Sequence, residues 1–135
     1  MSIEISPDLE ARLHKETVIW LTSVRADGTP QPTPVWFLWD GASFLIYTQP
    51  EARKVRNLQA NPRVALNLNS SAEGGEVAVF WGRAVLDPHA PPVTQVQAYL
   101  EKYRQGIADI GLDPERMAAR YALTIRIIPE RIRED

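Results

Sequence analysis

The stretch Thr33–Asn57, TPVWFLWDGASFLIYTQPEARKVRN, decides how the rest of the chain is organised. It begins with the β-branched and aromatic run Val35–Trp39, which favours a strand. Asp40-Gly41 follows, a dipeptide that readily takes the positive φ angles of a tight hairpin turn, and Phe44–Thr48 forms the returning strand. A short helix then starts at Gln49-Pro50-Glu51. The stretch therefore predicts an apolar β-hairpin that leads directly into a helix.

The first turns of that helix carry three cations, Arg53, Lys54 and Arg56. Helix N-termini present unpaired N–H groups and partial positive charge, so they suit a bound anion. A flat ring system that carries a phosphate would match both the apolar hairpin and the cationic helix start.

A simpler interpretation is that these cations and Asn57 form the solvated face of the helix, because surface lysines and arginines are the norm. The opposite face would then pack on the sheet through Ala52, Val55 and Leu58. The local sequence leaves both interpretations open.

Length and composition limit the classes to which the protein can belong. The 135 residues are within the usual range for one domain, residues 1–135, and suffice to bury a core. The net charge of −2 gives no basic field for nucleic acid or an anionic membrane. The absence of cysteine excludes disulfides, thiolate metal sites and cysteine nucleophiles. No apolar run reaches membrane-spanning length and the N-terminus is acidic, so we expect a cytoplasmic protein without a membrane span.

The pattern of apolar residues predicts at least six strands and four short helices. The expected strands are 17–24, 35–39, 44–48, 64–69, 76–86 and 121–127, and the expected helices are 7–16, the segment after 49, 93–105 and 114–120. Strands joined mostly by tight turns favour an antiparallel barrel or sandwich over a βαβ sheet. We therefore expect a mostly β protein, a β-barrel with short α-helices.

Single residues sharpen this expectation. Prolines in the segment Thr29–Pro32 lack N–H donors, which predicts a sheet edge there. Gly82 lies inside the longest strand and predicts a bulge or a close backbone approach. Gly106 is expected to end the helix that starts at residue 93, and Pro129 to end the last strand, with the charged tail 130–135 frayed.

No known catalytic motif occurs. The two histidines, His14 and His89, belong to no metal-type cluster, and we expect solvent-exposed or capping roles for them. There is no G-x-S-x-G elbow, phosphate loop or G-x-G-x-x-G sequence. These absences argue against a self-contained hydrolase. The remaining candidate for a functional site is the aromatic surface beside the cationic helix start.

The tryptophans add an argument about assembly. Trp36 and Trp39 are expected on opposite faces of one strand, so both faces of that strand must be covered. In a single-layer barrel only a partner subunit or a ligand could cover the outer face. This predicts a dimer with a ligand at or near the interface.

An ordered set of short motifs connects the chain to a known family. The motifs are Thr22, Asp27-Gly28-x-Pro30, Pro34–Phe37, Asp40-Gly41, Tyr47-Thr48, Lys54–Leu58 and Asn61–Val64. In order and spacing they resemble the flavin/deazaflavin oxidoreductases, relatives of pyridoxamine phosphate oxidase, and especially the branch that uses the deazaflavin cofactor F420. The long strand with Gly82 continues the resemblance.

The resemblance implies a split β-barrel, an antiparallel Greek-key fold like that of FMN-binding proteins, and a homodimer that holds two cofactors between its subunits. It places Thr33, Pro34, Val35, Trp36 and Phe37 along the ring system of the cofactor, and Thr48, Arg53, Lys54 and Asn57 at its phosphate or acidic tail. It also implies a wall from the partner subunit near Val77–Trp81. Arg56 could serve the tail or solvent equally.

The implied activity is an F420-dependent oxidoreductase, a reductase that transfers a hydride between F420 and a small conjugated acceptor. The alternatives are an FMN-binding oxidase or reductase of the same fold, or a non-catalytic module that binds a cofactor or a biliverdin-like tetrapyrrole. Three local cations mildly favour F420, because its glutamyl tail adds carboxylates to its phosphate. No catalytic residue is assigned; Tyr47 is a candidate by type only and is expected to pack in the core.

Overall fold

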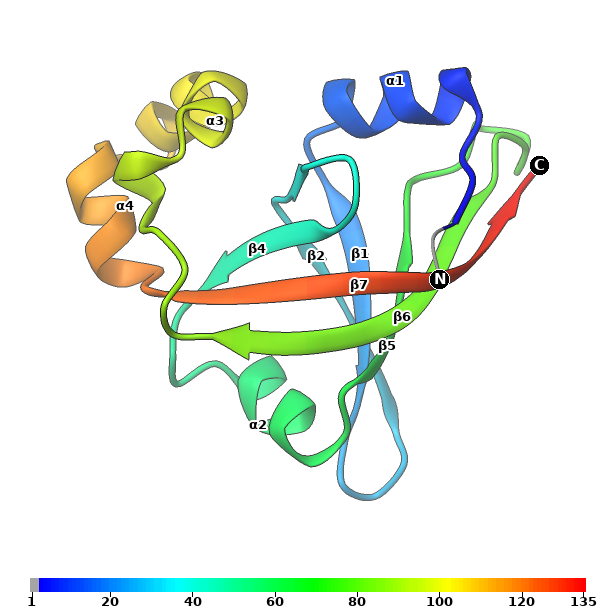
Figure 1. Ribbon diagram of the computed structural model, residues 1–135, viewed down its shortest axis with the longest axis horizontal. Coiled ribbons are helices and arrows are strands. Elements are labelled where there is room, and N and C mark those ends of the chain that lie inside the picture. Colours follow the sequence, from blue (N-terminus) through cyan, green and yellow to red (C-terminus); the bar gives the residue numbers. More distant parts are fainter. Residues whose placement is uncertain (1–2) are drawn as a thin grey trace.

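The computed structural model describes residues 3–135 and builds them around one antiparallel sheet in the order β2-β1-β5-β6-β7-β4-β3 (Figure 1). The strands are β1 Ile19–Val24, β2 Pro30–Val35, β3 Leu38–Trp39, β4 Phe44–Thr48, β5 Arg63–Asn67, β6 Ala78–Asp87 and β7 Leu123–Glu134. The helices are α1 Pro7–Lys15, α2 Arg53–Ala60, α3 Gln97–Asp109 and α4 Pro114–Arg120, with a 3₁₀ turn η1 at Val93–Gln95. The predicted mostly β fold with short helices is confirmed. No helix within residues 3–135 is long and apolar enough to cross a bilayer.

The sheet curls into a half-barrel, so that β1 and β2 run across the direction of β6 and β7 (Figure 1). Inside the curl, aromatic rings meet at short range: Phe44 lies 4.7 Å from Trp39 and 4.9 Å from Phe80 between ring centroids. The expected inward alternation of β5 and the residue after it is confirmed, because Val64, Leu66 and Leu68 are all buried. Burial of this apolar surface provides the main stabilisation of the sheet.

Helix α1 closes one end of the core. Its N-cap is Ser6, whose hydroxyl accepts a hydrogen bond from the backbone N–H of Leu9, and Pro7 occupies the first helical position, as expected. Leu9 and Leu13, one turn apart, are both buried in the core. Helix α1 thus lies across the top of the sheet, whereas α3 and α4 form a separate layer to its side (Figure 1).

The longest pairing, β6 with β7, confirms the role predicted for Gly82. The register shifts between Trp81 and Gly82, which marks a bulge. A Cβ atom at Gly82 would lie 2.2 Å from the carbonyl oxygen of Ile128, so no other residue fits without a backbone shift. Gly82 is therefore required for the close approach of these two strands.

The prediction that Pro129 ends the last strand is wrong. Strand β7 continues through Pro129 to Glu134, because Pro129 pairs with Gly82 at the bulge, where the regular ladder is already interrupted. The expected fraying of the tail is also wrong: the Ser6 hydroxyl bonds the Glu134 carboxylate, and Asp135 N donates to Val77 O at 2.9 Å. The prediction of a sheet edge at Pro30–Pro32 is correct, since β2 pairs only with β1.

The single strand expected at Val35–Trp39 is broken in the structure. Val35 ends β2, β3 begins at Leu38, and the backbone N–H of Phe37 donates to the Tyr103 hydroxyl at 2.8 Å instead of to a strand. Trp36 and Trp39 therefore do not lie on opposite faces of one strand. Trp36 packs against α3, and Trp39 lies in the main core. The argument that a partner subunit or a ligand must cover the outer face of this strand is therefore wrong.

A second apolar cluster joins α3 and α4 to the hairpin. Its buried members are Leu38, Leu45, Tyr47, Val93, Tyr99, Tyr103, Ile107 and Met117. Gly106 does not end α3, which continues to Asp109. A Cβ atom at Gly106 would lie 3.1 Å from Trp36 Cη2, so this glycine allows the Trp36 ring to approach the helix. Asp113 caps α4 as expected, accepting from Arg116 N at 2.8 Å.

Candidate functional site

A cavity of about 420 Å³ lies where the hairpin meets the later helices. The stretch Thr33–Asn57 contributes Pro34 and Val35 from the end of β2, Trp36 directly after it, Tyr47 and Thr48 from the end of β4, and Lys54 from the first turn of α2. The opposite wall comes from Tyr99, Ile110, Met117 and Tyr121 of the C-terminal half of the chain. The cavity therefore has an apolar, largely aromatic wall and one cationic side chain.

The aromatic wall is a continuous series of packed rings. Trp36 stacks on Tyr103 with centroids 4.6 Å apart and planes 8° from parallel. Tyr103 lies 4.7 Å from Tyr99, and Tyr99 lies 4.8 Å from Tyr47 in an edge-to-face arrangement. Trp36, Tyr99 and Tyr47 line the cavity, and Tyr103 supports them from behind. Such a wall suits a flat ring system, because aromatic faces pack well on planar ligands.

The cation of the cavity is Lys54. Its Nζ donates to Thr48 Oγ1 at 3.3 Å, and it forms no ion pair with any carboxylate among residues 3–135. Burial lowers the pKa of Lys54 because the charged ammonium loses hydration there. A partly buried cation without a counter-ion favours a bound anion. No side chain caps the N-terminus of α2 at Ala52, which adds unpaired N–H groups beside Lys54.

A second cavity, of about 380 Å³, lies at the other side of α2 and is lined by three guanidinium groups. Arg53 and Arg56 come from α2, and Arg25 comes from the turn between β1 and β2. Asp27 is the one carboxylate in its lining. None of the three arginines forms an ion pair within the described part of the chain. This cavity has the charge to hold additional anionic groups.

The structure thus brings together five of the predicted site residues, Pro34, Val35, Trp36, Thr48 and Lys54. Two more, Arg53 and Asn57, line the second cavity.

The last two predicted site residues, Thr33 and Phe37, line neither of these two cavities. The Phe37 side chain is 0% exposed within the core, and Thr33 pairs with Leu21 across β1 and β2.

Asn57 is not part of a solvated face. It is 7% exposed, and its Nδ2 donates to Ser23 Oγ at 3.1 Å and to Gln31 Oε1 at 2.7 Å. These bonds attach α2 to β1 and β2, so Asn57 positions the cationic turn beside the sheet. Its neighbours Val55 and Leu58 are buried, as the simpler interpretation of this helix required.

The wall made by Tyr99, Ile110, Met117 and Tyr121 is not among the site residues predicted from the sequence. Helical spacing predicted the helices that carry Tyr99 and Met117, but nothing local indicated that these helices pack over the end of β4. The two histidines have the exposed positions expected of them: His14 contacts Glu10 at 3.1 Å, and the backbone N–H of His89 donates to Asp87. Residues 3–135 hold no cluster of three metal-ligating side chains.

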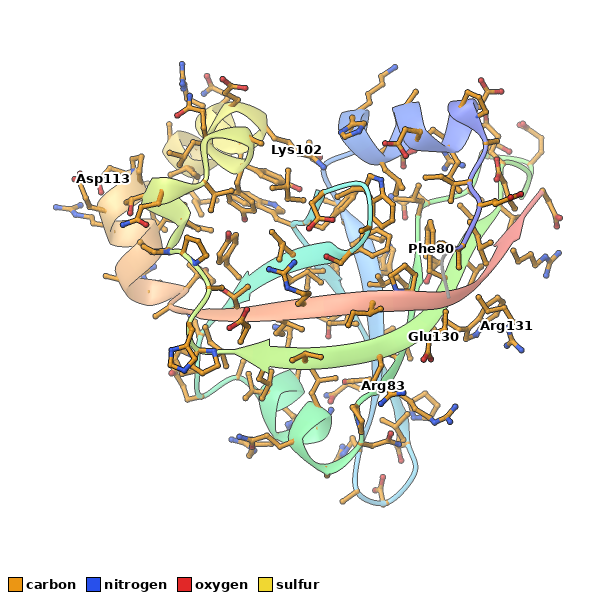
Figure 2. All side chains as sticks on the ribbon, viewed as in Figure 1. Phe80, Arg83, Lys102, Asp113, Glu130 and Arg131 are labelled. Carbon is orange, nitrogen blue, oxygen red and sulfur yellow. The ribbon has the colours of Figure 1, made fainter. Side chains whose placement is uncertain are left out.

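A third cavity, of about 560 Å³, lies on the outer face of the sheet. It is lined by Trp81 of β6 and Arg131 of β7, whose guanidinium carbon lies 4.5 Å from the Trp81 ring centroid. Arg83 and Glu130 form an ion pair at 3.5 Å on the same strands. Figure 2 shows Arg83, Glu130 and Arg131 together on one side of the molecule, away from α3 and α4.

Comparison with known proteins gives one family. The family model described as Pyridoxamine 5'-phosphate oxidase matches residues 5–134. None of the curated proteins matches the chain.

Solved structures show the same fold. A structure described as an F420 reductase has 26% identity and a TM-score of 0.73, covering 97% of this chain and 100% of that one. A structure described as “Putative Pyridoxamine 5'-phosphate oxidase” from Listeria innocua has 25% identity and a TM-score of 0.66, covering 94% of each chain. HutZ, described as the heme storage protein from Vibrio cholerae, has 16% identity and a TM-score of 0.68, covering 98% of this chain and 95% of that one. At that identity the likeness to HutZ shows the fold alone.

Proposed function

The chain belongs to the pyridoxamine 5'-phosphate oxidase family, and we propose that it is an F420-dependent oxidoreductase that reduces a small conjugated acceptor. The observation that carries this proposal is Lys54, a partly buried cation with no carboxylate partner among residues 3–135, at the edge of an aromatic cavity. A cofactor with a planar ring system and a phosphate would satisfy both features. When bound, F420 would supply hydride transfer, and this chain would bind it, orient it and exclude water.

Lys54 and Thr48 would hold the phosphate of the cofactor. The Lys54 ammonium is already directed to the Thr48 hydroxyl, at 3.3 Å, so a phosphate oxygen could accept from both groups. The ring system would lie along Pro34, Val35 and Trp36. Thr33 and Phe37 would contribute through the backbone of this segment, since the Phe37 side chain is in the core.

The arginine-lined cavity favours F420 over FMN. FMN carries no acidic group beyond its phosphate, whereas the glutamyl tail of F420 carries carboxylates. Arg25, Arg53 and Arg56 line a separate cavity beside the same helix, and we propose that they bind the carboxylates of the tail. The similarity to an F420 reductase along the whole of both chains supports the same cofactor.

An FMN-dependent oxidase or reductase is the second candidate. Lys54 and Thr48 suit any phosphate, and the chain is also 25% identical to the Listeria innocua pyridoxamine 5'-phosphate oxidase. If the cofactor is FMN, Arg25, Arg53 and Arg56 would have no role in binding it. Substitution of these arginines therefore distinguishes the two candidates by experiment.

We also propose that the protein acts as a cytoplasmic homodimer with the cofactor near the subunit interface. The outer face of the sheet supports this assembly, since the incompletely buried Trp81 lies there beside a cavity of about 560 Å³. This face includes part of the segment Val77–Trp81, which the resemblance assigns to the partner wall. Sedimentation velocity of the purified protein tests the dimer directly.

Replacing Lys54 tests the binding proposal. We expect Lys54→Met to weaken F420 binding by about 1.5–3 kcal/mol, the scale of a charge-assisted hydrogen bond. The matched control is Lys15→Met, which removes an exposed lysine from the last turn of α1. Equal affinity of both variants, measured by fluorescence titration, would mean that Lys54 is not the phosphate ligand.

A further inference from the structure

Tyr99 has a hydroxyl that the protein itself does not use. The residue is 1% exposed, yet its hydroxyl has no hydrogen-bond partner within residues 3–135. No buried polar side-chain atom in the described chain lacks a partner, so the Tyr99 hydroxyl must be the part of the residue that the cavity leaves accessible. An accessible hydroxyl that has no protein partner and belongs to a cavity-lining residue is a candidate ligand-binding group.

The hydroxyl of Tyr103, four residues further along α3, does have hydrogen-bond partners in the protein. Its hydroxyl accepts from Phe37 N at 2.8 Å and lies 2.7 Å from the carbonyl oxygen of Thr17, to which it can donate. Tyr103 therefore has a structural role, and it does not line the cavity. The two tyrosines differ in the partner of the hydroxyl and not in burial, since both are almost fully buried.

Tyr47 places a second hydroxyl at the same cavity. It is 8% exposed, comes from β4, and packs edge-to-face on Tyr99 with centroids 4.8 Å apart. Its hydroxyl also has no hydrogen-bond partner in the described chain. Burial raises the pKa of Tyr99 and of Tyr47, so both remain neutral O–H donors at any physiological pH.

The lining of the cavity restricts the chemistry of its ligand. Among the described residues that line it, Lys54 is the one charged side chain and none is a carboxylate. With Lys54 assigned to the phosphate of the cofactor, the tyrosine end remains for a neutral, flat molecule with a hydrogen-bond acceptor. An enone or a quinone has this chemistry.

Building on the function proposed above, we propose that the hydroxyls of Tyr99 and Tyr47 bind the carbonyl oxygen of a conjugated acceptor. Addition of a hydride to the β-carbon of such an acceptor moves the electron pair of its double bond toward this oxygen as an enolate. A solvent proton at the α-carbon then completes the reduction, and both tyrosines stay protonated. Donors directed at an oxygen on which charge develops stabilise the transition state more than the ground state. Tyr99 and Tyr47 would therefore act as catalytic residues through this oxygen.

The test is a binding experiment that does not depend on turnover. Pentafluorophenol, which is ionised at neutral pH, imitates the charged oxygen, and pentafluorotoluene is its counterpart without oxygen. Both are titrated by ¹⁹F NMR into protein saturated with oxidised F420, so that Lys54 is already occupied. We expect the wild-type protein to prefer the phenolate. Tyr99→Phe should reduce phenolate binding by about 10- to 100-fold, as for a hydrogen bond to a charged acceptor, and leave pentafluorotoluene binding unchanged.

Tyr103→Phe is the matched control, because it makes the same change on the same helix at a hydroxyl outside the cavity. It should lower thermal stability and leave the preference for the phenolate unchanged. Tyr47→Phe should reduce that preference as Tyr99→Phe does. Equal binding of the two probes by the wild-type protein, or a preference that survives both cavity substitutions, would overturn the proposal.

The affinity for F420 separates this proposal from the proposed function. If F420 binds and the phenolate preference is absent, the tyrosine assignment fails alone. If F420 does not bind, the proposed function fails, and titration of the Lys54→Met variant without cofactor still decides whether Tyr99 and Tyr47 bind the phenolate oxygen.

Discussion

The indole ring of Trp36 lies flat against the phenol ring of Tyr103, with centroids 4.6 Å apart and planes 8° from parallel. The contact joins two residues that lie 67 positions apart in the sequence. It holds α3 against the point where the hairpin strand breaks. Since Trp36 also lines the aromatic cavity, this contact connects the packing of α3 to the shape of the candidate site.

Tyr103→Phe should destabilise the protein while keeping this stack. The substitution leaves the buried N–H of Phe37 and the carbonyl of Thr17 without their partner, which costs about 1–3 kcal/mol. Urea unfolding measures the loss. Tyr121→Phe is the control, because Tyr121 is only half-buried and its hydroxyl has no partner within residues 3–135. Equal stability of the two variants would contradict the role given to Tyr103.

Gly82→Ala should be among the most damaging small substitutions in the chain. The added Cβ would lie 2.2 Å from the backbone oxygen of Ile128, which cannot rotate away as a side chain could. We expect a loss of about 2–3 kcal/mol from forced backbone movement. Gly75→Ala is the control, since its Cβ would meet only the Ser71 side chain, at 3.2 Å. Similar melting temperatures for both variants would disprove the close approach at the bulge.

Lys102 gives the stability a pH dependence that can be measured. Its Nζ donates to Leu13 O at 3.1 Å and to Phe37 O at 3.0 Å, and it lies between α3 and α1 (Figure 2). Burial lowers the pKa of Lys102 from 10.5 to about 8, with a partial opposing effect from Glu16. Between these two values the unfolded chain holds a proton that the folded chain has lost, so the contribution of Lys102 to the free energy of unfolding rises with pH.

The measurement is urea unfolding of the wild type and Lys102→Met at about pH 7 and about pH 9.5. The stability of the wild type relative to the variant should increase at the higher pH. Lys15→Met, at an exposed position, should show no such change relative to the wild type. A pH dependence that is identical in the wild type and Lys102→Met would refute the lowered pKa.

Arg25→Ala tests whether the second cavity holds the acidic tail. Arg25 lies on the turn between β1 and β2, and it shares a cavity with Arg53 and Arg56 of α2. Its loss should weaken binding of F420 by about 0.5–1 kcal/mol, the scale of an exposed charge pair, and leave FMN binding unchanged. Arg104→Ala, on the exposed face of α3, is the control. An equal effect of Arg25→Ala on both cofactors would show that the tail does not reach this cavity.

Local sequence was sufficient for elements whose causes are local. Ser6-Pro7 and Asp113-Pro114 predicted the starts of α1 and α4, because a capping side chain followed by proline acts within one turn. Gly82 predicted the bulge, since a glycine inside a strand usually marks a close approach. The alternation at Val64, Leu66 and Leu68 predicted the inner face of β5 and its continuation.

The errors arose where a distant residue decided the outcome. The strand at Val35–Trp39 breaks because the Tyr103 hydroxyl accepts the N–H of Phe37, and no pattern near Phe37 indicates this. Strand β7 passes Pro129 because Gly82 lies opposite it. Gly106 was expected to end its helix, but it lies inside α3, where its lack of a Cβ atom leaves room for the Trp36 ring.

Only the part of the candidate site that comes from one local stretch of sequence could be predicted. Lys54, Thr48 and Trp36 lie within the one stretch that carried the resemblance, and the hairpin brings them together. Tyr99 and Tyr121 reach the cavity only because α3 and α4 pack beside β4. The position of that packing depends on tertiary contacts and not on helical periodicity.

The most direct test of the central claim is a fluorescence titration of the purified protein with F420 and, separately, with FMN. The proposed function requires saturable binding of F420 at micromolar or lower concentration, with FMN clearly weaker, because FMN lacks the glutamyl carboxylates that we propose to bind in the cavity of Arg25, Arg53 and Arg56. Stronger binding of FMN would make the protein an FMN-dependent member of the same family. Binding of neither cofactor would contradict the assignment of Lys54 and the aromatic cavity to a cofactor.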